Sequence, residues 1–203
     1  NVEADVATVE RCLDELGLAF CFAPLLHQAM RHVAQVRRSL GVPTIFNLLG
    51  PLANPASAPF QLLGVGRPEL RPLLAQALVR LGTRRALVVS GDDGLDEVTL
   101  ATTTHVSEAT PTGVRDYVWS PEDFGLRRQS LEPLKVETPA QSAAMIRGVL
   151  GGEPGPARDI VLLNVAAALY VAGAESDLRL GVDRAAAAID RGAARRLLDE
   201  LGQ

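Results

Sequence analysis

Apolar residues recur at helical spacing through the first part of the chain. The spacing predicts one helix that starts after Asp5, a good N-cap residue, and runs to about Leu16, with Gly17 as its C-terminal stop. A second helix is predicted to start at Pro24, because proline is tolerated in the first turn of a helix. We therefore predict that residues 1–44 form a helical segment.

Strand and helix patterns alternate in the remainder of the chain. Strands are predicted at 60–65, 85–90, 104–108 and 113–118, and helices at 68–81, 142–150, 159–172 and 182–201, the last interrupted near Gly192. The 85–90 stretch contains a continuous apolar run, residues 86–89, which is typical of a strand buried on both faces. The helix at 159–172 is apolar nearly all round, so we expect it to be buried. Residues 121–126 are predicted to be a loop.

This order predicts a layered α/β domain over residues 45–203, with a mainly parallel sheet flanked by helices. Too few strands are visible to complete such a sheet. The chain also starts at Asn1 without an initiator methionine. We therefore expect that N-terminal strands of this domain, and part of the small helical domain, precede the sequence.

Composition and charge exclude several classes of protein. The chain is 47% hydrophobic, enough to bury a core, and its net charge of −4 with dispersed basic residues gives no support to nucleic-acid binding. Cys12 and Cys21 form no metal-binding spacing with the histidines, so a reduced, cytoplasmic setting is expected. No apolar run is long enough to span a membrane.

The stretch from residue 27 to residue 54 combines cations with a rigid loop. A predicted helix carries Arg37 and Arg38, and it is followed by the breakers Gly41 and Pro43 and then by apolar residues. Such a loop suits a small planar acid, with a guanidinium for its carboxylate and apolar walls for its ring. The alternative is an ordinary helix, cap and surface loop.

The stretch with the most candidate ligand residues is SGDDGLDE, residues 90–97, which begins at the end of the predicted buried strand. Ligands of open α/β sheets bind at the carboxyl ends of the strands. Asp96 and Glu97 can flank a hard cation there, since Mg²⁺ takes one or two carboxylates together with waters and phosphate oxygens. The alternative is an acidic turn built by residues 92–94. Asn164, in an apolar helix, is interpreted as a satisfied core amide.

Several longer motifs together resemble the anthranilate phosphoribosyltransferase family. They are FAPLLHQAMRHVAQVRRSLG, TIFNLLGPLANP, GDDGLDE, SPEDFGL, DIVLLNVAAALYVAG and AAIDRGAARRLLDEL, in the family's order along essentially the whole chain. The resemblance implies a nucleoside-phosphorylase-like transferase fold, a small helical domain beside a large α/β domain. It also implies transfer of a phosphoribosyl group from phosphoribosyl pyrophosphate to anthranilate in tryptophan biosynthesis, with release of pyrophosphate and a homodimeric full-length protein.

The resemblance also assigns roles to residues of this chain. Arg37 matches the arginine that binds the anthranilate carboxylate, and Asp96 and Glu97 match the pair that holds Mg²⁺ under the pyrophosphate. The other residues implied to line the anthranilate site are His27, Met30, Gly50 and Pro51. In the family's His-Pro-Ala-Met motif this chain has Gln28 where proline stands, which we expect to loosen the helix start.

The family's phosphate-binding glycine loop is not found in this sequence. We therefore expect the 203-residue chain alone to be inactive and to expose an apolar sheet edge. Two alternatives stay open: a related phosphoribosyltransferase or pyrimidine-phosphorylase-like enzyme with another acceptor, and a non-catalytic binding module that kept the fold. Arg37 disfavours the first, because an uncharged base needs no carboxylate partner.

Overall fold

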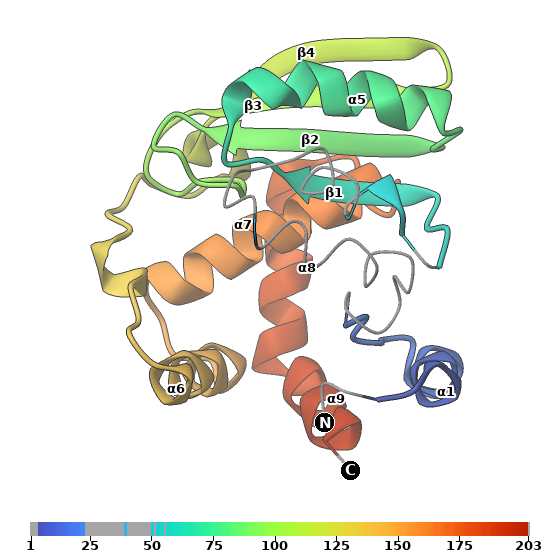
Figure 1. Cartoon of the computed structure of the whole chain (residues 1–203). Helices are drawn as coiled ribbons and strands as arrows, with labels where there is room; N and C mark the ends of the chain where they lie inside the picture. The colour runs from blue at the N-terminus through green and yellow to red at the C-terminus, as the bar shows by residue number, and fades with distance from the viewer. Residues whose placement is uncertain (1–3, 23–38, 40–49, 51, 55, 203) are drawn as a thin grey trace. The chain divides into compact units, whose positions relative to one another are not determined.

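A computed structural model of the chain describes residues 4–22, 39, 50, 52–54 and 56–202 (Figure 1). The chain divides into two compact units, one made of residues 1–58 with 196–203 and the other of residues 59–195. The boundary predicted between residues 44 and 45 lies outside the described residues and stays a prediction. Within the described part of the chain, none of the helices has the length and apolar character needed to cross a membrane.

The first unit contains helix α1 (Val6–Leu16), as the apolar spacing predicts. The Asp5 side chain caps it by accepting a hydrogen bond from the Thr8 backbone N–H at 2.8 Å. Gly17 ends the helix in the left-handed region, with φ of 71°, and its N–H donates to the Leu13 carbonyl. Both ends of the helix therefore follow from local residue chemistry. The second predicted helix, from Pro24, lies outside the described residues.

The second unit is built on a sheet of four described strands in the order β1 (Phe60–Gly64), β2 (Arg85–Gly91), β3 (Thr104–Thr110) and β4 (Gly113–Trp119). Strands β1 and β2 are parallel, whereas β2–β3 and β3–β4 are antiparallel. The α/β class is confirmed, but the described sheet is mixed rather than mainly parallel. The reason is that only the β1–β2 connection contains a crossover helix; the chain returns from β2 through a loop and from β3 through a tight turn.

Helices cover both faces of this sheet (Figure 1). Helix α5 (Arg71–Arg80), preceded by the short 3₁₀ helix η1 (Pro68–Leu70), packs on β2, β3 and β4. Helix α7 (Pro156–Val171) packs on β1 and β2 and against α8 (Leu178–Asp190). Because side chains alternate along a strand, one set of β2 residues meets the α7 core and the other set faces α5.

The remaining elements refine the predictions. Helix α6 (Pro139–Leu150) begins three residues earlier than expected, because Thr138 forms a capping box with Gln141. Residues predicted as a loop contain the 3₁₀ helix η2 (Pro121–Phe124), and another, η3 (Glu132–Leu134), follows it. Helix α9 (Ala193–Leu201) is separated from α8 near Gly192, as predicted.

Helix α7 was expected to be a buried helix, and the structure confirms this for one face only. Val165 is 38% exposed, and Ala168 is also exposed, whereas Leu163 and Ala167 are fully buried. The apolar composition of α7 therefore overstates its burial: one face packs in the core with β2 and α8, and the other does not. Apolar residues at such positions need not be buried, because sequence hydropathy does not record which neighbours a helix meets.

Candidate functional site

The acidic stretch predicted at residues 90–97 begins at the carboxyl end of β2 and continues as a loop, which is held by hydrogen bonds of its own backbone and of Asp93. The Gly91 N–H donates to the Leu95 carbonyl at 2.9 Å, and the Gly94 N–H donates to the Gly91 carbonyl at 3.0 Å. The Asp93 carboxylate accepts from the Thr99 hydroxyl at 2.6 Å and from the Leu95 N–H at 3.1 Å. Asp93 is thus occupied in shaping the loop, which is the turn role considered for it from the sequence.

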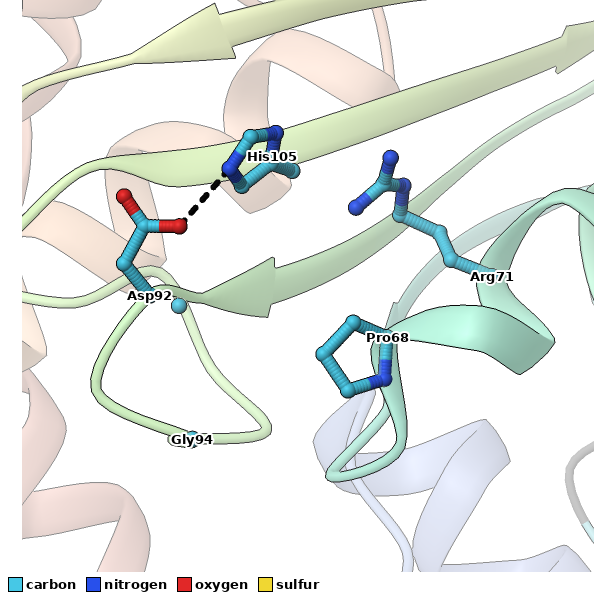
Figure 2. A pocket seen from close by; sticks show the side chains of 6 residues that line it. Pro68, Arg71, Asp92, Gly94 and His105 are labelled. Carbon is cyan, nitrogen blue, oxygen red and sulfur yellow. Dashed lines mark hydrogen bonds and ion pairs between the residues drawn. The ribbon is translucent and has the colours of Figure 1, made fainter.

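A cavity of about 340 Å³ lies beside the first half of this loop (Figure 2). Arg71 at the start of α5 donates from Nε to the Ser107 hydroxyl and from Nη1 to the Ser90 hydroxyl, both at 3.0 Å. Across the cavity, His105 and Asp92 form a hydrogen bond of 2.8 Å. No role for His105 was predicted from the sequence, because its partner is brought to it only by the β2–β3 pairing and the loop.

Asp96 and Glu97 differ from the two preceding acidic residues. Both are exposed, and neither carboxylate forms a hydrogen bond or ion pair with any residue in the described part of the chain. Although the Glu97 side chain reaches solvent, the atoms packed around it partly desolvate its carboxyl group and raise its pKa, and the adjacent Asp96 charge raises the pKa further. Two neighbouring carboxylates whose oxygens have no partner in this part of the chain are a suitable donor set for Mg²⁺, which completes its coordination with waters and phosphate oxygens.

Among the residues that the structure describes, no group of three or more histidine, cysteine, aspartate or glutamate side chains is arranged to hold a metal. The candidate site therefore offers a pair of carboxylates and not a complete protein cage. This is the usual arrangement for Mg²⁺, which dehydrates reluctantly and is held jointly by one or two carboxylates and by substrate phosphates. The residues present fit that ion.

The backbone around Asp96 and Glu97 is fixed by two contacts from other elements. Gly64, at the end of β1, approaches Asp96 so closely that a Cβ atom at position 64 would overlap the Asp96 carbonyl. On the other side of the pair, the Asn164 side chain of α7 accepts from the Val98 N–H at 3.0 Å and donates to the Val98 carbonyl at 2.9 Å. The pair is thus presented by a loop that a strand end and a core helix both restrain.

Sequence reasoning missed these two supporting residues as parts of the site. Asn164 was correctly interpreted as a satisfied amide, and its place in an apolar helix indicated that it must have partners. Nothing in the sequence showed that the partner is the residue directly after Glu97. Gly64 gave even less indication, since a glycine at a strand end is also compatible with an ordinary turn.

Of the residues predicted to bind anthranilate, Gly50 alone is among those that the structure describes. Arg37, His27, Met30 and Pro51 lie outside the described residues. Gly50 is described: it is exposed, helical, and its carbonyl accepts from the Ala53 N–H at 3.3 Å. Their role at an anthranilate site stays a prediction.

An α/β domain that presents two adjacent carboxylates at the carboxyl edge of its sheet is suited to binding phosphorylated ligands through a metal ion. Residues 1–195 match the family described as glycosyl transferase family, a/b domain, and the chain belongs to that family. Its curated relatives include the anthranilate phosphoribosyltransferase of Dechloromonas aromatica, 50% identical over 200 residues, which are 98% of this chain and 59% of the relative. The enzyme of the same name from Trichlorobacter lovleyi is 48% identical over 201 residues, 99% of this chain and 58% of the relative.

Solved structures give the same result. The crystal structure of anthranilate phosphoribosyltransferase from Thermus thermophilus superposes with a TM-score of 0.91 at 44% identity, covering 99% of this chain and 60% of that one. The Saccharomyces cerevisiae enzyme in complex with phosphoribosyl pyrophosphate and Mg gives 0.89 at 30% identity, covering 98% and 58%. The resemblance predicted from the motifs is therefore confirmed. The chain spans 59% of the length of the first relative.

Proposed function

We propose that the protein to which this chain belongs transfers the phosphoribosyl group of phosphoribosyl pyrophosphate to the amine of anthranilate, releasing pyrophosphate, as a step of tryptophan biosynthesis. The proposal is supported by the relatives, which carry this activity in their names at 48–50% identity. It is also supported by the yeast structures, one with phosphoribosyl pyrophosphate and Mg and another with 4-fluoroanthranilate.

The observation that carries the proposal is the Asp96–Glu97 pair. Four acidic residues follow β2, and two of them are used within the protein, Asp92 by His105 and Asp93 by the loop itself. The other two are exposed on a restrained loop without a partner among the described residues. An arrangement serving only the turn would not need Asp96 and Glu97, whereas a site for a metal-bound pyrophosphate would.

The chain's residues would act mainly by binding and orienting. Asp96 and Glu97 would hold Mg²⁺, which when bound neutralises the negative charge that develops on the departing pyrophosphate. Arg37 would pair with the anthranilate carboxylate and so direct the aromatic amine toward C1 of the ribose. An aryl amine is a weak base that needs little deprotonation, so orientation contributes more than a general base.

Substitution of Asp96 in the whole protein tests this proposal. We expect Asp96→Asn to raise the Mg²⁺ concentration needed for half-maximal rate at least about tenfold, by loss of a charged ligand. Asp92→Asn is a matched control in the same loop, since Asp92 already has His105 as its partner. The rate is followed by the loss of anthranilate fluorescence. Equal Mg²⁺ requirements in both variants would contradict the assigned metal pair.

The resemblance further implies a cytoplasmic homodimer, and we propose both for the whole protein. Cys12 and Cys21, both free thiols, are consistent with a reducing compartment. Sedimentation velocity of the whole protein at several concentrations tests the dimer, and a single monomeric species at all concentrations would exclude it.

A further inference from the structure

The backbone directly after the Asp96–Glu97 pair turns from solvent into the core. Glu97 is exposed, whereas Val98, Thr99 and Leu100 are each at most 1% exposed. Val98 lies outside the sheet ladders, so its backbone N–H and carbonyl have no strand partner. A buried backbone group that lacks a hydrogen bond costs about 1–3 kcal/mol, so these two groups require a partner from elsewhere in the fold.

One side chain satisfies both groups. The Asn164 carboxamide accepts from the Val98 N–H at 3.0 Å and donates to the Val98 carbonyl at 2.9 Å, in the manner of a neighbouring strand. The two residues are 66 positions apart in the sequence and belong to different elements. The contact therefore fixes the point at which the acidic loop enters the core.

Asn164 is itself held in one orientation. Besides its two bonds to Val98, its amide nitrogen donates to the Ile160 carbonyl, one turn earlier in α7, at 3.0 Å. With the oxygen and both amide hydrogens engaged, the opposite orientation of the carboxamide would place donor against donor and acceptor against acceptor. Helix α7 is anchored in the core by neighbours such as Leu163, which is fully buried. The Asn164 side chain is therefore held in a fixed position on a helix that is itself anchored in the core.

The other side of the pair is restrained by a steric contact with Gly64. Gly64 lies against the Asp96 backbone at a distance that leaves no room for a side chain, and Gly64 is itself in the β1–β2 ladder opposite Val89. Asp96 and Glu97 thus lie between the close contact with Gly64 on one side and the hydrogen bonds of Asn164 to Val98 on the other. Two adjacent carboxylates bind one cation well only if their backbone geometry is preserved, since ligands held by neighbouring interactions tune metal affinity.

We propose that Asn164 is a positioning residue for the Asp96–Glu97 carboxylate pair, acting through the Val98 backbone. Asn164 touches neither substrate nor metal in this role; it sets the direction in which the chain presents the two carboxylates. This inference rests on the proposed function, because it takes the pair to be the metal site.

Mn²⁺ binding to the whole protein in the presence of pyrophosphate tests the proposal, with free Mn²⁺ measured by electron paramagnetic resonance. We expect Asn164→Ala and Asn164→Ser to weaken Mn²⁺ binding about tenfold, since neither side chain can reach both groups of Val98. Leu163→Ala is the matched control on the same helix: it removes buried apolar contacts and lowers stability, but we expect its Mn²⁺ affinity to stay within about twofold of the wild type.

Hydrogen exchange supplies a readout that does not depend on the metal. In the Asn164 variants the Val98 amide should lose its protection, while amides in the β2–β3 ladder keep theirs. In Leu163→Ala any increase in the exchange rate should instead affect the Val98 amide and the amides of the β2–β3 ladder alike. Retained protection of Val98 in both Asn164 variants would overturn the proposal.

Asp96→Asn in the same Mn²⁺ titration separates failure of the inference from failure of the proposed function. If Asp96→Asn binds Mn²⁺ like the wild type, the metal site itself is wrongly assigned and the positioning role is overturned with it. If Asp96→Asn weakens binding but the Asn164 variants bind no more weakly than Leu163→Ala, the positioning role is overturned and the metal site stands.

Discussion

Glu108 on β3 links the neighbouring strands β2 and β4 through two ion pairs, and its replacement by glutamine should lower the free energy of unfolding. The carboxylate is 7% exposed and accepts from Arg85 Nε on β2 and from Arg115 Nη2 on β4, both at 2.7 Å. Arg85 extends the link, since its Nη1 donates to the Tyr170 carbonyl of α7 at 2.7 Å and its guanidinium lies 4.3 Å from the centre of the Tyr170 ring. Removal of the Glu108 charge leaves Arg85 largely buried without a counterion.

The expected loss follows from these contacts. Hydrogen bonds to charged groups contribute about 1.5–3 kcal/mol each, and removal of one partner of a buried pair costs about 3–5 kcal/mol. Arg115 is 70% exposed, so solvent screens most of its interaction and the cost comes mainly from Arg85. Glutamine keeps one acceptor oxygen for Arg85. We therefore expect Glu108→Gln to lower the free energy of unfolding by about 2–4 kcal/mol at neutral pH.

The pH dependence gives a sharper check. Burial alone would raise the pKa of Glu108, but the hydrogen bonds and charges of Arg115 and Arg85 outweigh it and hold the pKa below its ordinary value. A carboxylate whose pKa is lowered on folding stabilises the fold above its unfolded-state pKa and loses that contribution as the pH falls through the folded pKa. The stability difference between wild type and Glu108→Gln should therefore shrink as the pH falls from about 7 to about 3.

Urea-induced unfolding, followed across that pH range, measures this difference. Glu122→Gln is the matched control, because Glu122 pairs with Arg128 at 3.2 Å where both side chains are at least half exposed. The control should change stability little at any pH, since exposed pairs are screened by solvent. A stability difference for Glu108→Gln that is constant with pH, or no larger than that of Glu122→Gln, would show that the Glu108 charge does not stabilise the fold.

Three further predictions concern the loop, the acceptor and a helix start. Gly64→Ala should lower the free energy of unfolding by about 1–3 kcal/mol and weaken Mn²⁺ binding, because the added methyl group overlaps the Asp96 carbonyl. Gly66→Ala is the control and should do neither, since its Cβ would lie 4.0 Å from the Asp96 Cβ. Equal urea midpoints for the two variants would contradict this prediction. Arg37→Ala should raise the KM for anthranilate at least about tenfold through loss of a charge-assisted pair, with the KM for phosphoribosyl pyrophosphate as the internal control. Thr138→Ala should cost about 0.5–2 kcal/mol in thermal unfolding through loss of the capping box, and an unchanged Tm would count against the cap.

Much of the fold could be predicted from residues close together in the sequence. The caps of α1, Asp5 and Gly17, act within three or four positions of themselves. The β3–β4 hairpin follows from two strand patterns around a short turn, and β2 follows from an unbroken apolar run. The acidic loop and its carboxylate pair were likewise found from their position after that run. Each of these depends on local chemistry, which a sequence states directly.

Other features depend on groups far apart in the chain and are seen only in the folded protein. The antiparallel direction of β3 against β2 and the exposure of Val165 follow from how elements pack, and periodicity does not record a helix's or strand's neighbours. The same holds for the site. Asp96 and Glu97 were identified from the sequence, but only the fold shows that Gly64 and Asn164 restrain them. Such contacts between separate elements arise only when the core assembles, because buried backbone groups must then find hydrogen-bond partners.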